Sequence, residues 1–172
     1  MSTIEELARE IESLKLRVAS SESRLEIVAL KARYAQLVDQ RFSRGNVIDN
    51  ESLALVATRA AELFTVDGSW DGGPGLGVSI GRDAIAERLR EPTLDFSRHF
   101  FMNPMIDLAG DSAIARWDLL SPCRRADGTS YWMSGYEDDE YERVDGAWLH
   151  RSMRLTTVFM APIGEGWDRI FA

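Results

Sequence analysis

Cysteine is almost absent from this sequence, and long apolar runs are missing altogether. The single Cys123 cannot form a disulfide within the chain, which indicates a reduced protein. No uncharged apolar stretch has the length of a membrane span, and the acidic N-terminus lacks the apolar region of a signal peptide. We therefore expect a cytoplasmic protein that has no membrane attachment.

Positive charge is also scarce. Lys and Arg total 20 against 28 Asp and Glu, which gives a formal net charge of -8. A field of this sign repels phosphate backbones and anionic lipid. We expect a small-molecule substrate, and neither a nucleic-acid nor a membrane partner.

The start of the chain has the pattern of a long helix, because no Gly or Pro precedes Gly45. Its aliphatic residues recur at gaps of three and four, as in a coiled coil: Ile4, Leu7, Ile11, Leu14 and Val18. Serines at 20, 21 and 23 predict a new helix near 23–42. We therefore divide the chain into a helical extension, residues 1–22, and a domain, residues 23–172. The extension is either an oligomerisation arm or a helix that only packs on the domain.

The rest of the chain changes from helical to strand patterns. A helix capped by Asn50 and another over 82–90 flank a glycine-rich loop or irregular strand at 66–77. Four β-rich segments follow, roughly 97–108, 112–124, 130–143 and 147–160, and two of the turns contain Asp-Gly. Helices followed by hairpins predict an α+β fold, with helices on one face of an antiparallel sheet. Long strands curl, so we expect a half-open cone with an apolar pocket.

His99 is the candidate base of that pocket. Strand alternation places a base, an amide and two apolar side chains on one face of the first long strand: His99, Asn103, Phe101 and Met105. Pro104 indicates a bulge or an edge within this strand. The alternative interpretation is a core histidine whose nitrogens are satisfied internally.

A histidine base needs an acceptor that fixes its tautomer, and Asp39 is the candidate. It follows Leu37 and Val38 on an apolar helix, where a carboxylate is out of pattern, although solvation or pairing with Arg41 would also explain it. Tyr34 precedes Asp39 by five residues, which is about 140° around a helix. The two side chains can share a cavity only by flanking its mouth.

Three segments carry a family resemblance: Leu-Lys-Ala-Arg-Tyr-Ala-Gln-Leu-Val-Asp at 30–39, His-Phe-Phe-Met-Asn at 99–103 and Glu-Tyr-Glu-Arg-Val-Asp-Gly-Ala-Trp at 140–148. They resemble the SnoaL-like branch of the nuclear transport factor 2-like superfamily over about 25–165. Within it they are most similar to scytalone dehydratase, bile-acid dehydratase and hexachlorocyclohexane dehydrochlorinase. The resemblance implies a cone-shaped α+β barrel that forms a homo-oligomer, with a trimer favoured, and that uses no metal or organic cofactor.

The same resemblance assigns roles to residues. Asp39 and His99 match the family's aspartate–histidine pair, Tyr34 matches an assisting tyrosine, and Asn103 matches a pocket asparagine. The second pocket histidine of scytalone dehydratase has no counterpart. The acid of the bile-acid enzymes aligns near Leu120 or Ser121, with Asp118 close by, so the acid that protonates the leaving group stays unassigned.

These observations predict a cofactor-independent lyase of the dehydratase type, with His99 as the base. The substrate is a small apolar or polycyclic hydroxylated carbonyl compound, and the predicted pocket walls are Phe101, Met105, Trp117 and Met133. An isomerase or polyketide-type cyclase with the same base is one alternative, and a non-catalytic ligand-binding or oxygenase-associated subunit is another. The acidic run at 137–140 is interpreted as a solvated strand face.

Overall fold

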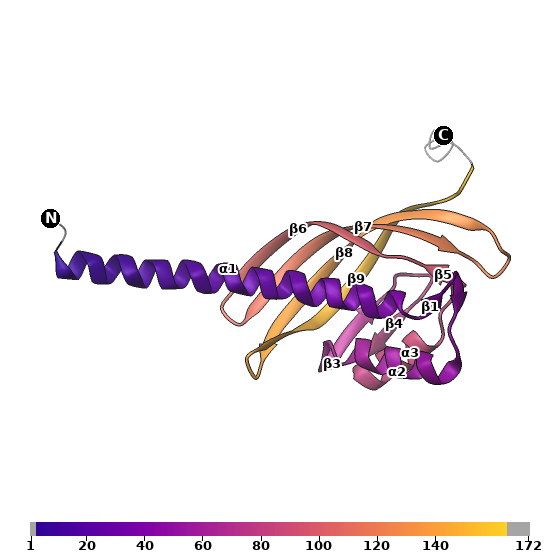
Figure 1. Ribbon diagram of the computed structural model, residues 1–172, viewed down its shortest axis with the longest axis horizontal. Coiled ribbons are helices and arrows are strands. Elements are labelled where there is room, and N and C mark those ends of the chain that lie inside the picture. The colour runs from indigo at the N-terminus through magenta and orange to yellow at the C-terminus, as the bar shows by residue number, and fades with distance from the viewer. Residues whose placement is uncertain (1–2, 165–172) are drawn as a thin grey trace.

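The computed structural model describes residues 3–164, in which helices pack against a curved sheet (Figure 1). The helices are α1 (Ile4–Asp39), α2 (Asn50–Ala61) and α3 (Arg82–Arg90). The strands are β1 (Phe42–Ser43), β2 (Asn46–Val47), β3 (Phe64–Asp71), β4 (Val78–Ile80), β5 (Phe96–Ser97), β6 (Phe100–Ala109), β7 (Ser112–Arg124), β8 (Ser130–Val144) and β9 (Ala147–Pro162). Strands β6 to β9 are the four predicted β-rich segments, each within three residues.

The main sheet of the described residues runs in the order β4-β3-β9-β8-β7-β5, with β6 also paired to β7. The neighbouring strands are antiparallel except β3 and β9, which run parallel. The predicted α+β fold with a half-open, curved sheet is therefore confirmed. The sheet differs from the prediction in this one parallel pair. The first half of the segment at 66–77, assigned to a loop or irregular strand, belongs to β3.

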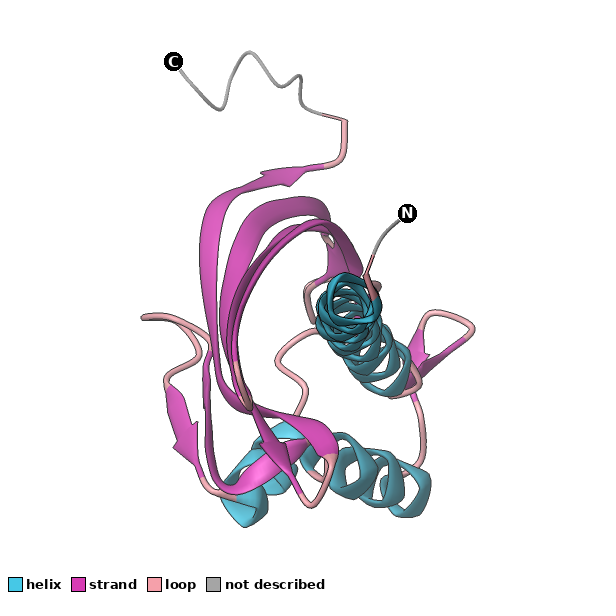
Figure 2. Ribbon diagram, turned by 90° about the vertical axis from the view of Figure 1, so that its left-hand side faces the viewer, coloured by secondary structure: helices cyan, strands magenta, loops and turns pink. Residues whose placement is uncertain are grey.

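The sheet curls around the second half of α1, while α2 and α3 cover its lower end (Figure 2). A bulge between Ser134 and Gly135 lies in the pairing of β8 with β9. A Cβ atom at Gly135 would lie 2.2 Å from the carbonyl oxygen of Thr156, so only glycine fits there. Bulges bend strands and increase their twist, which helps to produce the concave face that holds the core.

Helix α1 is continuous, and the predicted second helix start at the serines is wrong. Ser21 and Ser23 donate their hydroxyls to the carbonyls of Arg17 and Ala19, four residues earlier. Serines bonded in this way remain inside a helix instead of capping a new one. Burial changes within this single helix, since residues 4–22 are exposed and Ile27 is fully buried. The division between residues 1–22 and 23–172 stays a prediction.

The two short helices are close to the prediction. Helix α3 has the predicted bounds, and Gly81 is its N-cap. Helix α2 is capped by Asp49, whose side chain accepts from the Ser52 amide, rather than by Asn50. No helix among residues 3–164 combines the length and apolarity needed to cross a membrane.

Candidate active site

Asp39 and His99 are in direct contact, although 60 residues separate them. Asp39 is the last residue of α1, and His99 directly precedes β6. One carboxylate oxygen of Asp39, Oδ1, lies 2.8 Å from His99 Nδ1 and accepts from the His99 backbone amide at 3.1 Å. Because a carboxylate only accepts, Nδ1 carries the proton of the neutral ring, and Nε2 is the basic nitrogen.

The pair is only partly shielded from solvent. The side chain of Asp39 is 6% exposed and that of His99 is 16% exposed. The second oxygen of Asp39 lies 3.3 Å from Nε of the exposed Arg98. Arg41, the alternative partner considered above, donates instead to the carbonyls of Val38 and Leu89. The carboxylate therefore has two partners, and His99 is the more buried of them.

His99 lines a small space inside the cone, which we call the inner cavity. Its volume is about 90 Å³, and Tyr34, Met133 and Glu137 also line it. A wider vestibule of about 760 Å³ lies next to it, near the glycine-rich segment at 72–76. The residues common to the linings of both spaces are Leu76, Thr93, Leu94, Met133 and Leu155. Of these two spaces, only the vestibule falls in the usual volume range of about 300–1,000 Å³ for ligand pockets.

Tyr34 lies in the wall of the inner cavity and is almost fully buried. Its hydroxyl oxygen accepts from Trp70 Nε1 at 3.1 Å. Burial raises the pKa of the Tyr34 hydroxyl well above its usual value, with a further contribution from Glu137. The hydroxyl therefore keeps its proton at neutral pH and can donate it in a hydrogen bond.

The predicted wall residues fall into three places. Met133 lines both the inner cavity and the vestibule. Phe101 and Trp117 line a groove of about 590 Å³ between α1 and strands β6 and β7, and His99 lines it too. The rings of His99 and Phe101 are stacked, with centroids 6.1 Å apart and planes 18° from parallel. His99 thus lies between the inner cavity and this groove.

Asn103 and Met105 lie apart from His99, and the prediction that they share its face is wrong. A bulge between Met102 and Met105 interrupts the pairing of β6 with β7, and Asn103 has a φ of 50°. The extra residue reverses the alternation, as Pro104 indicated. Asn103 consequently donates to Asp118 on the outer face of the sheet, and Met105 is 72% exposed.

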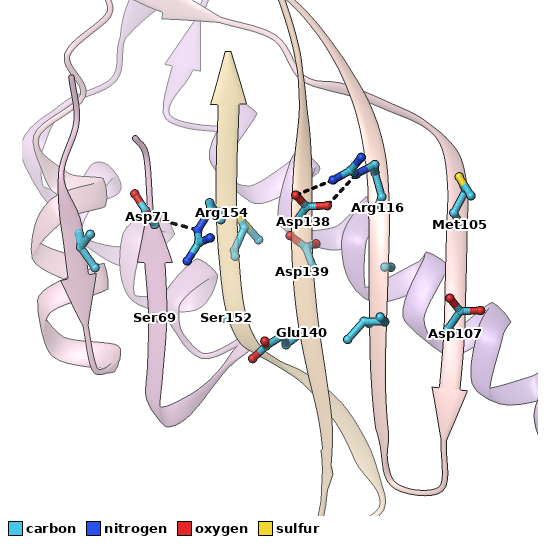
Figure 3. Close-up of a pocket in the computed structure, with 14 residues that line it drawn as sticks. Ser69, Asp71, Met105, Asp107, Arg116, Asp138, Asp139, Glu140, Ser152 and Arg154 are labelled. Atoms are coloured by element: carbon cyan, nitrogen blue, oxygen red, sulfur yellow. Dashed lines mark hydrogen bonds and ion pairs between the residues drawn. The ribbon is translucent and has the colours of Figure 1, made fainter. Parts of the chain in front are cut away.

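Met105 borders a hollow of about 580 Å³ on that outer face (Figure 3). Two ion pairs lie in it, Arg116 with Asp138 and Arg154 with Asp71. Neither Asp39 nor His99 lines this hollow. We therefore place the candidate active site on the concave side of the sheet.

The core contains a buried cluster of charged residues that the sequence did not lead us to predict. The interpretation of residues 137–140 as a solvated face holds for Asp138 and Glu140. It is wrong for Glu137 and Asp139, which point inward and are 4% and 2% exposed. Lys31 Nζ, also buried, contacts Glu137 Oε2 and lies 2.7 Å from Asp139 Oδ2. Tyr141 donates to the same Asp139 oxygen at 2.7 Å. We call Lys31, Glu137, Asp139 and Tyr141 the Lys31 cluster.

The cluster holds one ammonium and two carboxyl groups away from water. Burial lowers the pKa of Lys31, but the two carboxylates outweigh it, so the net shift is upward from 10.5. Burial raises the pKa of Asp139 to about 6, against the opposing attraction of Lys31. Because Lys31 is on α1 while both acids are on β8, the contacts fasten the helix to the sheet and hold Asp39 beside His99.

His150 is another buried residue to which the sequence assigned no role. It is fully buried among the rings of Tyr34, Phe64 and Tyr141, with centroids 4.8 to 5.7 Å away. Its Nδ1 lies 3.7 Å from Asp139 Oδ2, beyond hydrogen-bond distance, and within the described chain neither ring nitrogen has a hydrogen-bond partner. Burial lowers the pKa of His150 well below 6.5, and the charge of Lys31 adds to this. The ring is therefore neutral.

Comparison with solved structures shows the same fold. A hexachlorocyclohexane dehydrochlorinase of LinA type 3 from Novosphingobium barchaimii is 19% identical, with a TM-score of 0.72 over 87% of this chain and 96% of its own. A protein from Novosphingobium aromaticivorans, provisionally named a scytalone dehydratase, is 21% identical, with a TM-score of 0.67 over 86% and 97%. No curated protein matches the sequence. A family model does match, over residues 19–154, and the chain belongs to the SnoaL-like domain family.

Proposed function

We propose that this protein is a cofactor-independent lyase in which His99 is the general base. The observation that carries the proposal is the 2.8 Å contact of His99 Nδ1 with Asp39 at the wall of the inner cavity. A carboxylate at Nδ1 makes Nε2 the nitrogen that can take a proton from a substrate. The names of the dehydrochlorinase and of the scytalone dehydratase relative support elimination chemistry for this fold.

The first step of the proposed reaction is removal of a proton next to a carbonyl group. Nε2 of neutral His99 takes the proton, and the electron pair moves onto the carbonyl oxygen. Asp39 stabilises the imidazolium that forms, and the Tyr34 hydroxyl donates a hydrogen bond to the developing oxyanion. A positioned base of this kind contributes a factor of about 10²–10⁴ to the rate.

The second step is departure of the hydroxyl group, which needs a proton. Glu137 is our candidate for this acid, because it lines the same inner cavity as His99 and Tyr34. Its carboxyl group is buried on the inward face of β8, and in this role it would act as a carboxylic acid. When the electron pair returns from the oxyanion, the carbon–oxygen bond breaks, Glu137 gives its proton, and water leaves.

The spaces around His99 fit a substrate with an apolar body. The inner cavity has room for the reacting end alone, and the body of the substrate would extend into the vestibule. Met133, Leu155 and Met160 line the vestibule, so its walls favour an apolar or ring-containing carbonyl compound. Phe101 and Trp117 line the groove on the other side of His99, and the Phe101 ring stacks on that of His99. In this proposal they do not contact the substrate.

An isomerase or polyketide-type cyclase is the second candidate, and one observation favours it. Lys31 Nζ contacts Oε2 of Glu137, so this carboxyl oxygen already has an ionic partner. A Glu137 that only balances the charge of Lys31 would supply no proton to a leaving group. The reaction would then stop at proton transfer or ring closure. The non-catalytic alternative predicts that Asp39 and His99 are apart and that the pocket is narrow or filled. Their contact speaks against it, whereas the inner cavity of about 90 Å³ is narrow.

The test is turnover of small β-hydroxy ketones, hydroxylated aromatic ketones and hydroxysteroids, followed by mass spectrometry. A lyase gives a product lighter by one water, whereas an isomerase or cyclase conserves the mass. In D₂O, His99→Gln is expected to lower both proton exchange and elimination by about 10²–10⁴-fold. Glu137→Gln is expected to spare exchange and slow elimination. Undiminished turnover by His99→Gln would contradict the proposal.

The proposal includes the assembly and location that the sequence indicates. We propose a homotrimer, which the family resemblance favours. We also propose a cytoplasmic location, which the single buried Cys123 supports. Sedimentation equilibrium of the full chain measures the assembly.

A further inference from the structure

The first part of α1 projects from the rest of the molecule as a free helix (Figure 1). Every residue from 4 to 22 is exposed, whereas the helix is held to the sheet from about Ser23 onward. We call residues 4–22 the arm. At about 1.5 Å per residue the arm is about 28 Å long. A single helix of this length is marginally stable in water without packing, so the arm has the properties of a helix that pairs.

One side of the arm carries an aliphatic seam from residue 4 to residue 18. Its members are exposed by 47–86%, and they are Ile4, Leu7, Ile11, Leu14 and Val18. Because α1 is continuous, the same spacing extends through Ser21 to Leu25 and Val28. This sequence of gaps of three and four gives the a and d positions of four heptads.

The seam faces away from the domain that carries it. Leu25 is 68% exposed, while Tyr34, nine residues further along, is buried against the sheet. Nine residues turn a helix by about 180° beyond full turns, so Leu25 and Tyr34 point in opposite directions. A second helix can therefore pack along the seam of the arm, whereas Val28 at the far end lines the groove beside β6 and β7.

The residue types on the seam select the number and direction of strands. Within the arm the a positions are Ile4, Ile11 and Val18, all β-branched, and the d positions of the first two heptads are Leu7 and Leu14. The fourth a position, beyond the arm, is Leu25. β-branched residues at a combined with leucine at d favour a parallel two-stranded coiled coil over three or four strands.

The charges beside the seam fit the same arrangement. In a parallel pair, each g position faces the e position of the next heptad on the other helix. Glu10 at g would face Lys15 of the partner subunit, and Arg17 at g would face Glu22 of the partner subunit. Both pairings join opposite charges, and two-fold symmetry makes each of them twice.

We propose that the arm pairs with the arm of a second copy of this chain as a parallel two-stranded coiled coil. A lipid surface fits the arm less well, because its five Glu outnumber its three Lys and Arg, whereas surface-binding helices are rich in basic residues. The contact is separate from the cavity that holds His99 and from any contact between the domains.

The first experiment compares masses of the full chain by sedimentation equilibrium, using Leu14→Asp and its matched control Leu16→Asp. Both leucines are exposed, at 52% and 67%, but Leu16 lies at position f, away from the seam. The proposal expects Leu14→Asp to halve the mass of the assembly and Leu16→Asp to leave it unchanged. The mass is halved whether a dimer separates into monomers or a pair of trimers separates into single trimers. An unchanged mass in Leu14→Asp, a fall to one third, a monomeric wild type, or equal effects of both variants would overturn it.

The second experiment tests direction by exchanging charges. Glu10→Lys alone and Lys15→Glu alone are each expected to weaken association about tenfold, because attraction becomes repulsion in two symmetric pairs. The double variant, with both exchanges, is expected to restore most of the affinity. Weak association of the double variant would contradict the parallel arrangement, since in an antiparallel pair positions 10 and 15 do not face each other.

Discussion

His99 and His150 each lie beside an aspartate, but the two pairs differ in distance and in exposure. His99 contacts Asp39 at 2.8 Å and borders a cavity, with 16% of its side chain exposed. His150 is fully buried, lies 3.7 Å from Asp139 and has Lys31 as a positive neighbour. The first pair can exchange a proton with a ligand, whereas the second is kept neutral inside the core. Geometry and burial, rather than residue types, separate a candidate catalytic pair from a structural one.

The largest effect on stability is expected from removing the positive charge of Lys31 from the Lys31 cluster. Lys31→Met leaves the carboxyl groups of Glu137 and Asp139 without their cation, and breaking a buried pair in this way costs about 3–5 kcal/mol. Urea denaturation at pH 7.5 measures the free energy of unfolding.

The matched control for Lys31→Met is Arg116→Met, which breaks an ion pair of equally good geometry on the exposed face. Water screens that pair, so its loss is expected to be far smaller. Similar losses for the two variants would mean that the Lys31 cluster does not hold α1 to the sheet.

The next effect concerns the pH dependence of stability. Since the pKa of His150 is far below 6.5 in the folded protein, the unfolded chain takes up the proton first, and stability falls as the pH drops below about 6.5. The raised pKa of Asp139 acts with the opposite sign, because its contribution is lost as the pH rises from about 4 to about 6.

The His150 contribution is isolated by the variant His150→Phe, which fits the surrounding rings. Between pH 7.5 and 5 the wild type is expected to lose about 2 kcal/mol more than this variant. The measurement is urea denaturation of both proteins at the two values of pH. Identical pH dependence would show that His150 takes up its proton without unfolding.

The smallest effect on stability is expected at Arg98, the exposed partner of Asp39. Arg98 lies 3.3 Å from Asp39 but is 59% exposed, so Arg98→Gln is expected to change stability by less than about 1 kcal/mol. Turnover should remain within a few-fold of wild type, because His99 keeps its own contact with Asp39. A large loss of turnover would make Arg98 part of the site.

Local signals in the sequence predicted much of the fold and the meeting of Asp39 with His99. Turns such as Asp145-Gly146 separate the long strands, and an acid beside Leu37 and Val38 is out of place unless it has a buried partner. The family resemblance supplied that partner.

Features that depend on distant residues were not predictable in the same way. Glu137 and Asp139 alternate along β8 as inward residues do, but their partner Lys31 is more than 100 residues away. One inserted residue at the β6 bulge moved Asn103 and Met105 to the outer face. The serines of α1 gave a false helix start, because hydroxyl bonding to an earlier carbonyl and capping use the same residue type.

The central claim is that Asp39 fixes the neutral ring of His99 with its proton on Nδ1 and leaves Nε2 free as the base. Nitrogen-15 NMR of the imidazole rings at pH 8 measures this directly without a substrate, and His150→Phe assigns the two signals. The account predicts an Nδ1-protonated tautomer for His99 in the wild type and loss of that preference in Asp39→Asn. An Nε2-protonated His99 in the wild type, or a tautomer that Asp39→Asn leaves unchanged, would contradict it.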